Sequence, residues 1–211
     1  MYKLYWCRQT AALAPELILE ESGLPYEKVL VDTAKLEHRR LDYLAVNPAG
    51  LVPALALPGG AVLTETAAIV LWLCDEHRLE LAPPPGDPAR AVFLRWLFQL
   101  SNVVQTTYKR FNFPQRFSMA AEAAADDIKA RALAQLDEHW KQLDDQFATA
   151  GPWVLGDRVS AVDLYLAMLV TWYPDTRALL GRHPALRRCF LAVLERPVAG
   201  RILRAHGEVP V

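Results

Sequence analysis

Hydrophobic residues change their spacing partway along the chain. Up to about residue 78, short alternating segments typical of strands are interleaved with segments of helical spacing, whereas beyond residue 88 the spacing is helical only. The stretch between them, LELAPPPGDP, is rich in proline and follows neither period, which is typical of a linker. The pattern therefore predicts two domains, residues 1–78 and 89–211, joined by a linker at 79–88.

The first region reads as a small α/β domain. The segments YKLYW and YEKVLVD are strand-like and flank a helix, LAPELILEESG, which we expect to begin near Ala11 or Ala12 because Pro15 must lie in its first turn. A mixed segment, RRLDYLAV, leads to a hairpin turned by Gly59 and Gly60, and the helix TETAAIVLWLCDEH closes the region. The order β-α-β-α-β-β-α, with a right-handed first crossover, predicts a small sheet covered by helices.

The second region reads as all-helical. Its first long segment, AVFLRWLFQLSNVVQTTYKRF, is apolar on more than one side, so it needs two neighbours, one of which we expect to be another copy of the chain. Further on, Ser160 and Asp163 have the spacing of a capping box at the start of SAVDLYLAML. Such a cap stabilises a helix by roughly 1 kcal/mol, so we interpret this motif as structural.

Composition excludes several classes of protein. Lys and Arg number 23 against 24 Asp and Glu, for a formal charge of -1, so no basic surface for nucleic acid is expected. The chain shows no signal peptide and no apolar run long enough to cross a bilayer, and we expect it in the cytoplasm. The cysteines, Cys7, Cys74 and Cys189, are scattered, as are the five histidines, so neither a disulfide framework nor a metal site is predicted.

Two motifs in the first region have the chemistry to hold a ligand. In NPAGLVP, a cis bond between Val52 and Pro53 at a strand entrance would leave the backbone amide and carbonyl of Val52 unpaired, as a docking strip for an extended peptide. In TET, Thr64 is a plausible N-cap, and the first-turn N–H groups with the Thr66 hydroxyl would bind a carboxylate. Glu65 beside them would bind an ammonium group. Together they fit the head of an α-amino acid, although Thr-Glu-Thr is also a common capping composition.

At this point the chain resembles a family. The segments KLY, LEESGLPYE, NPAGLVPAL, LTETAAIV, the proline-rich linker and LGDRVSAVDLYLA are similar, in order and over essentially the whole chain, to bacterial cytosolic glutathione transferases of the beta type. The resemblance implies a thioredoxin-like domain that binds glutathione, an all-α C-terminal domain, a homodimer and a role in detoxification. It also implies that Val52 and Pro53 meet the cysteinyl unit, that Glu65 and Thr66 hold the γ-glutamyl head, and that Lys35 or a nearby basic residue meets the glycyl carboxylate.

The catalytic position departs from the beta type. The family's active-site cysteine falls on Ala11 and the next position on Ala12, so a mixed-disulfide mechanism is not expected. Relatives that use serine or cysteine elsewhere align that residue near Gln9 or Thr10, and tyrosine-using relatives align theirs with Tyr5. We expect Thr10 to stabilise the glutathione thiolate, because it precedes a helix N-terminus, with Tyr5 as the second candidate and Gln9 as a contact.

Alternatives remain at each of these positions. Thr10 could simply cap the helix or close a turn, Tyr5 could pack within its strand, and Cys7 is interpreted as inert because it lies before the helix N-terminus that would activate it. For the second substrate we expect Tyr108 and Phe111 to line a pocket. The sequence thus predicts a glutathione transferase that conjugates glutathione to a small hydrophobic electrophile without a metal. The alternatives are a glutathione-dependent disulfide or peroxide reductase and a non-catalytic binding protein.

Overall fold

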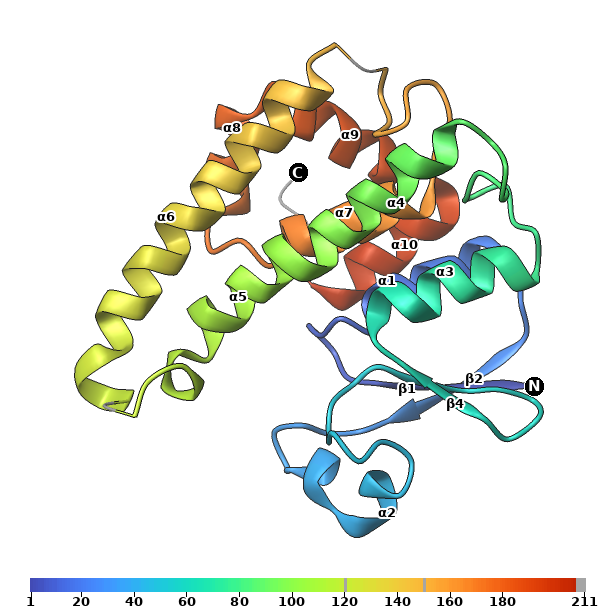
Figure 1. Ribbon diagram of the computed structural model, residues 1–211, viewed down its shortest axis with the longest axis vertical. Coiled ribbons are helices and arrows are strands. Elements are labelled where there is room, and N and C mark those ends of the chain that lie inside the picture. Colours follow the sequence, from blue (N-terminus) through green and yellow to red (C-terminus); the bar gives the residue numbers. More distant parts are fainter. Residues whose placement is uncertain (120, 150, 208–211) are drawn as a thin grey trace. The chain divides into compact units, whose positions relative to one another are not determined.

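The structure, a computed structural model, describes residues 1–119, 121–149 and 151–207 (Figure 1). The chain divides into two compact units, one formed by Met1–Asp87 with the C-terminal stretch that begins at Val193, and one formed by Pro88–Ala192. The division after Asp87 falls inside the proline-rich segment. Helix α10 (Pro197–His206) belongs to the first unit, an arrangement that the sequence-based boundaries do not include.

The first unit contains a four-stranded mixed sheet in the order β2-β1-β3-β4. Strands β1 and β2 are parallel, and the other two pairs are antiparallel. The predicted element order is confirmed. The strands are β1 (Tyr2–Trp6), β2 (Tyr26–Leu30), β3 (Ala54–Ala56) and β4 (Val62–Thr64); the other elements are α1 (Leu13–Glu21), η1 (Glu37–Arg39), α2 (Leu41–Leu44), α3 (Thr66–Glu76) and α10.

Alternation along β1 assigns its side chains to the two faces of the sheet. Leu4 is completely buried, and on the same face the ring of Tyr2 packs edge-on against Trp72 of α3, with centroids 6.0 Å apart. Tyr5 points to the opposite face, where its ring lies 5.8 Å from that of Tyr43 in α2. Figure 1 shows the same layering, with α1 and α3 on one side of the sheet and α2 on the other.

The second unit is helical, apart from an isolated bridge between Trp153 and Gly156 in the described part of the chain. Its long first helical segment is interrupted by a π-helical turn, η2, which the sequence pattern does not predict. The elements are α4 (Ala89–Gln99), η2 (Leu100–Val104), α5 (Gln105–Asn112), η3 (Pro114–Arg116), α6 (Ala121–Phe147), α7 (Ala161–Thr171), α8 (Thr176–Arg182) and α9 (Pro184–Glu195).

The predicted capping box begins α7. The Asp163 carboxylate is completely buried and accepts hydrogen bonds from the amide of Ser160 at 2.7 Å and from its hydroxyl at 2.8 Å. The amide of Val154 donates to the other oxygen at 2.7 Å, which ties the preceding loop to the same side chain. The motif is therefore structural, as expected. Within the described ranges, none of the helices combines the length and apolarity that a bilayer span requires.

Candidate functional site

Strand register brings the predicted binding motifs together at one edge of the sheet, namely the end where β1 and β4 finish and β3 begins. Ala54, the first residue of β3, pairs with Tyr5 of β1 and with Thr64 of β4. Because both pairs are antiparallel, Pro53 lies opposite Trp6, the last residue of β1, and Val52 lies just beyond it; both lie just beyond Thr64, the last residue of β4. They are therefore beside the corner that follows β1 and beside the start of α3.

Two side-chain contacts join other segments to this edge. The Thr66 hydroxyl lies 3.5 Å from the carbonyl oxygen of Ala11, so the start of α3 meets the corner before α1. The Cys7 sulfur lies 3.5 Å from the hydroxyl of Thr33, in the loop after β2 that also carries Lys35. The structure thus gathers the residues predicted to bind glutathione at one place.

The Val52–Pro53 bond is cis, as predicted. Neither the amide nor the carbonyl of Val52 bonds another described residue, so both are available to a ligand. The preceding carbonyl, that of Leu51, accepts hydrogen bonds from the Tyr43 hydroxyl at 2.6 Å and from the side-chain amide of Asn47 at 2.7 Å. Sequence analysis missed both donors, although an Asn that opens an N-P-A-G turn is a signal for such a side-chain bond.

Gly50 in this loop needs to be glycine. Its φ is +59°, and a Cβ there would lie 2.8 Å from the carbonyl oxygen of His38 and 3.0 Å from a side-chain nitrogen of Arg39. The loop before Val52 is therefore packed directly against the segment that follows β2.

The start of α3 differs from the prediction in one respect. Thr64 was expected to be the N-cap, which is wrong: pairing with Ala54 keeps it as the last residue of β4, and Glu65 occupies the cap position without a side-chain capping bond. Glu65 has φ +66° and ψ +116°, a conformation that costs a non-glycine residue about 1–3 kcal/mol and that clusters at ligand clamps. Its exposed carboxylate has no partner in the described part of the chain. The first-turn amides of α3 and the Thr66 hydroxyl lie beside it.

Thr10 forms a tight local turn. Its hydroxyl donates to the Cys7 carbonyl at 2.7 Å and accepts from the Ala12 amide at 3.3 Å, which matches the turn alternative considered for this residue. The single hydroxyl proton can therefore reach a bound thiolate only if the O–H turns away from the Cys7 carbonyl. The Ala11 amide, by contrast, has no hydrogen-bond partner among the described residues. It is a second candidate donor at the same corner.

Gln9 and Lys35 occupy exposed positions at this edge. Gln9 has φ +54° and turns the chain between β1 and α1. Lys35 is 76% exposed, and the Asp32 carboxylate, 3.0 Å from its ammonium nitrogen, raises the pKa of Lys35. A ligand carboxylate at Lys35 would have to share that ammonium with Asp32.

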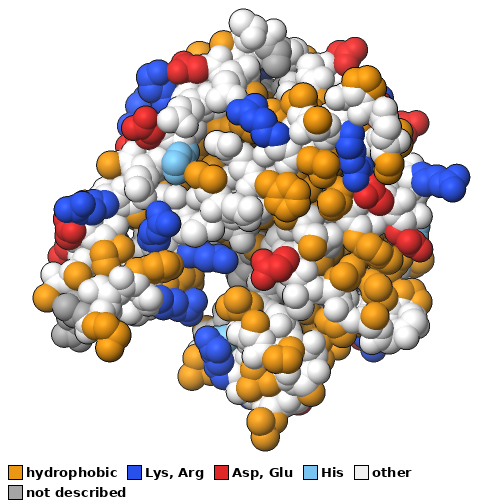
Figure 2. Space-filling model, in the orientation of Figure 1, with side chains coloured by type: hydrophobic (Ala, Val, Ile, Leu, Met, Phe, Trp, Pro, Cys, Tyr) orange, Lys and Arg blue, Asp and Glu red, His pale blue; other side chains and the backbone are white. Residues whose placement is uncertain are grey.

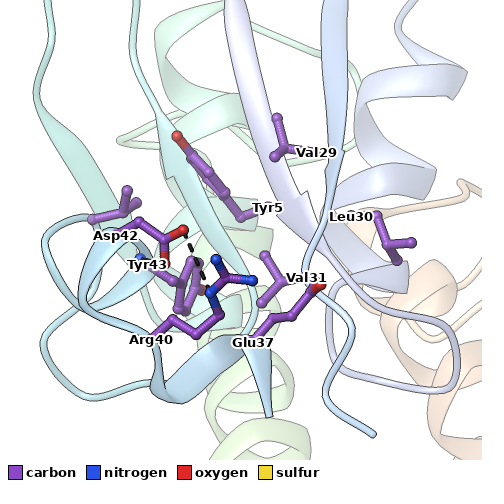
Figure 3. Close-up of a pocket in the computed structure, with 9 residues that line it drawn as sticks. Tyr5, Val29, Leu30, Val31, Glu37, Arg40, Asp42 and Tyr43 are labelled. Atoms are coloured by element: carbon purple, nitrogen blue, oxygen red, sulfur yellow. Dashed lines mark hydrogen bonds and ion pairs between the residues drawn. The ribbon is translucent and has the colours of Figure 1, made fainter. Parts of the chain in front are cut away.

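Tyr5 is not gathered with these residues. Its ring lines a cavity of about 290 Å³ on the α2 face of the sheet, together with Val29, Val31 and Tyr43 (Figure 3). Neither Thr10 nor any of Val52, Glu65 and Thr66 lines this cavity. The packing alternative for Tyr5 therefore fits the structure better than a catalytic role.

The two residues predicted to line a second-substrate pocket differ in burial. Tyr108 is completely buried, its hydroxyl accepts a hydrogen bond from the Trp140 ring N–H at 3.3 Å, and its ring stands edge-on to Trp172. The expectation that Tyr108 lines a pocket is thus corrected, because its helical position faces the core of the second unit and burial raises the pKa of its hydroxyl. Phe111 is half-buried, and its role stays a prediction.

Comparison with known proteins identifies the family. Residues 12–76 match the glutathione S-transferase N-terminal domain, and residues 126–188 match the glutathione S-transferase C-terminal domain. The chain belongs to the glutathione transferase family. A probable glutathione S-transferase of rice (Oryza sativa subsp. japonica), GSTF2, is 40% identical over 189 residues, which cover 88% of this chain and 87% of that protein.

Two further relatives of this glutathione transferase bear on its chemistry. The crystal structure of a glutathione transferase homologue from Sulfitobacter, with bound glutathione, has a TM-score of 0.88 and 26% identity, and covers 97% of this chain and 98% of that one. The disulfide-bond oxidoreductase YfcG of Escherichia coli (strain K12) is 26% identical over 210 residues, which cover 96% of this chain and 94% of that protein. The predicted family, the thioredoxin-like and helical domain types and the enzyme class are confirmed.

Proposed function

We propose that this glutathione transferase binds glutathione at the sheet edge and adds its thiol to a small hydrophobic electrophile. The observation that carries the proposal is that several groups able to bind a peptide lie together at this edge of the sheet. These are the amide and carbonyl of Val52 and the Glu65 carboxylate, which have no partner among the described residues, and the Thr66 hydroxyl 3.5 Å from the Ala11 carbonyl oxygen.

Each part of glutathione finds complementary chemistry at this edge. The γ-glutamyl carboxylate fits the N-terminus of α3 and the Thr66 hydroxyl, and its ammonium group fits Glu65. The cysteinyl unit pairs with the backbone of Val52 as an added strand would. The glycyl carboxylate then extends toward the loop of Lys35. No metal takes part in this arrangement.

The proposed chemical step depends on a lowered thiol pKa. A free thiol titrates near ~8.5, and lowering this value by about two units requires ~2.7 kcal/mol of differential stabilisation. A hydrogen bond to a charged group contributes roughly 1.5 to 3 kcal/mol. The Ala11 amide and a rotated Thr10 hydroxyl, at the corner that Thr66 contacts, are the proposed donors.

Replacing the γ-glutamyl contacts tests glutathione binding. Glu65→Gln and Thr66→Val are each expected to raise the Kd for glutathione about 10-fold or more, because each removes a charge-assisted hydrogen bond worth roughly 1.5 to 3 kcal/mol. Isothermal titration calorimetry measures this directly. Glu80→Gln, an exposed site in the same unit, serves as the matched control and should bind like the wild type. An unchanged Kd in both test variants would remove the γ-glutamyl subsite from the proposal.

A second candidate function, reduction of a disulfide or peroxide by the bound thiol, has the relationship to a disulfide-bond oxidoreductase in its favour. Turnover of an aromatic halide and of a mixed disulfide, compared on the same preparation, separates the two. A protein that binds glutathione but turns over neither would be the non-catalytic alternative. Cys7, Cys74 and Cys189 form no disulfide among the described residues, which fits a reducing compartment, and we propose that the protein works in the cytoplasm.

We also propose a homodimer that uses the outer face of α4 and η2. Val92, Phe98 and Val103 are 44%, 48% and 37% exposed there, and Figure 2 shows hydrophobic side chains uncovered over α4. Residues 88–121 contain Lys and Arg but no Asp or Glu, whereas α6 is rich in acidic residues, so two copies can pair basic with acidic helices. Sedimentation velocity should give twice the mass of the chain, and a monomer would contradict this.

A further inference from the structure

One carbonyl in the first unit is held unusually firmly. The Leu51 oxygen accepts from the Tyr43 hydroxyl at 2.6 Å and from the Asn47 side chain at 2.7 Å, and Asn47 is only 4% exposed. The side-chain oxygen Oδ1 of Asn47 in turn accepts a hydrogen bond from the Ala49 amide at 3.1 Å. Both donors are therefore themselves anchored, Asn47 by a hydrogen bond within its own loop and Tyr43 by its position as a buried residue of α2.

The planarity of the peptide bond carries this restraint to the next residue. The Leu51 carbonyl and the Val52 amide belong to one trans peptide unit, so they point in opposite directions. Two donors on the inner side fix the plane and aim the Val52 N–H outward, where it has no described partner. Hydrogen bonds to the carbonyl also polarise the unit and strengthen the N–H as a donor, by roughly 10–30% in condensed-phase estimates.

We infer that Asn47 and Tyr43 are positioning residues for the glutathione backbone, acting through the Leu51–Val52 peptide without touching the ligand. The inference rests on the proposed function, since it presumes that Val52 binds the cysteinyl unit. It predicts a loss of affinity for glutathione with little change in turnover once the site is saturated, because neither residue contacts the reacting thiol.

Tyr43→Phe removes one of the two donors and keeps the ring. We expect the Kd and the KM for glutathione to rise about fivefold, because that is the effect of losing one neutral hydrogen bond on a binding constant. The kcat at saturating glutathione should stay within twofold of the wild-type value. Tyr26→Phe is the matched control, because it deletes a hydroxyl that bonds Glu20 at 2.8 Å on a different part of the unit. Tyr26→Phe should leave the Kd and the KM for glutathione unchanged.

Asn47→Asp provides a readout that a merely structural residue would not give. The ionised carboxylate turns a donor toward the Leu51 carbonyl into an acceptor, whereas the protonated acid can donate again. Because Asn47 is buried and faces a carbonyl oxygen, the pKa of an aspartate there should lie above its ordinary ~3.9. The ratio of the variant's glutathione Kd to that of the wild type should therefore be large at pH 7 and should fall as the pH is lowered toward 5. Thermal unfolding at both pH values shows whether Asn47→Asp is folded. If it is unfolded, the proposal is tested by Tyr43→Phe alone.

The outcomes separate the two proposals. If the wild type binds glutathione, and Tyr43→Phe and folded Asn47→Asp bind it equally well at every pH, the positioning role is overturned while the proposed function stands. A kcat that falls in proportion to the rise in KM would also overturn it, because the residues would then act on the chemical step. If the wild type does not bind glutathione, both proposals fail.

Discussion

Asp163→Ala is expected to lower the free energy of unfolding by about 3 to 5 kcal/mol. The change removes the acceptor for the buried amides of Ser160 and Val154, and each unsatisfied buried donor costs about 1–3 kcal/mol, in addition to a helix cap worth ~1 kcal/mol. Urea unfolding followed by tryptophan fluorescence measures the loss. Asp157→Ala, an exposed acidic residue six positions earlier, should change stability by less than about 0.5 kcal/mol. Similar stabilities for the two variants would show that the capping box does not organise α7.

The second large effect concerns a buried ion cluster that attaches α10 to α1 and β2 within the first unit. Glu16 is 2% exposed, with one oxygen 2.5 Å from the Lys28 ammonium and the other 2.8 Å from the His206 ring. Glu16→Gln leaves the Lys28 ammonium without its counter-charge and replaces one acceptor oxygen of the buried carboxylate by an NH2 group, which for a buried pair costs about 3 kcal/mol. We expect that loss at pH 7. Glu27→Gln, which breaks an exposed pair with Lys3, should cost under ~1 kcal/mol.

The pH dependence of this cluster has a definite sign. Burial opposes ionisation of Glu16, but hydrogen bonds from His206 and Lys28 outweigh it and lower the pKa of the carboxyl group. A carboxyl group whose folded pKa is depressed contributes stability that is present above its unfolded pKa and is lost as the pH falls through the folded pKa. The stability difference between the wild type and Glu16→Gln should therefore shrink as the pH falls from about 5 to 3. A difference that stays constant or grows would contradict the assigned pairing.

What the sequence could predict was mainly local. The Ser160 and Asp163 spacing, the glycine turn of the hairpin and the strand at YKLYW each depend on neighbouring residues, and each prediction is confirmed. The cis bond before Pro53 is likewise a local feature that the sequence indicates. Long-range partners could not be read in this way. Glu16 and His206 lie at opposite ends of the chain, and nothing in either local sequence indicates the other.

The two errors have a common physical origin. Thr64 has the composition of a helix cap, but strand pairing with Ala54 takes precedence over that local preference. Tyr108 has the spacing of a pocket residue, but the same helical position faces Trp140 in the core. Periodicity identifies an apolar face without saying whether a ligand or another helix covers it.

The central claim is that this edge of the sheet activates the glutathione thiol, and a pH titration of the far-ultraviolet thiolate absorbance of bound glutathione tests it most directly. The account predicts a wild-type pKa well below the free value of ~8.5. Thr10→Ala should raise the pKa of the bound thiol by about one unit, because it removes one hydrogen bond to a charged group. Tyr5→Phe should leave this pKa unchanged, because Tyr5 lies on the α2 face of the sheet. Bound glutathione that titrates like the free tripeptide would contradict the claim and leave the site as a binding pocket only.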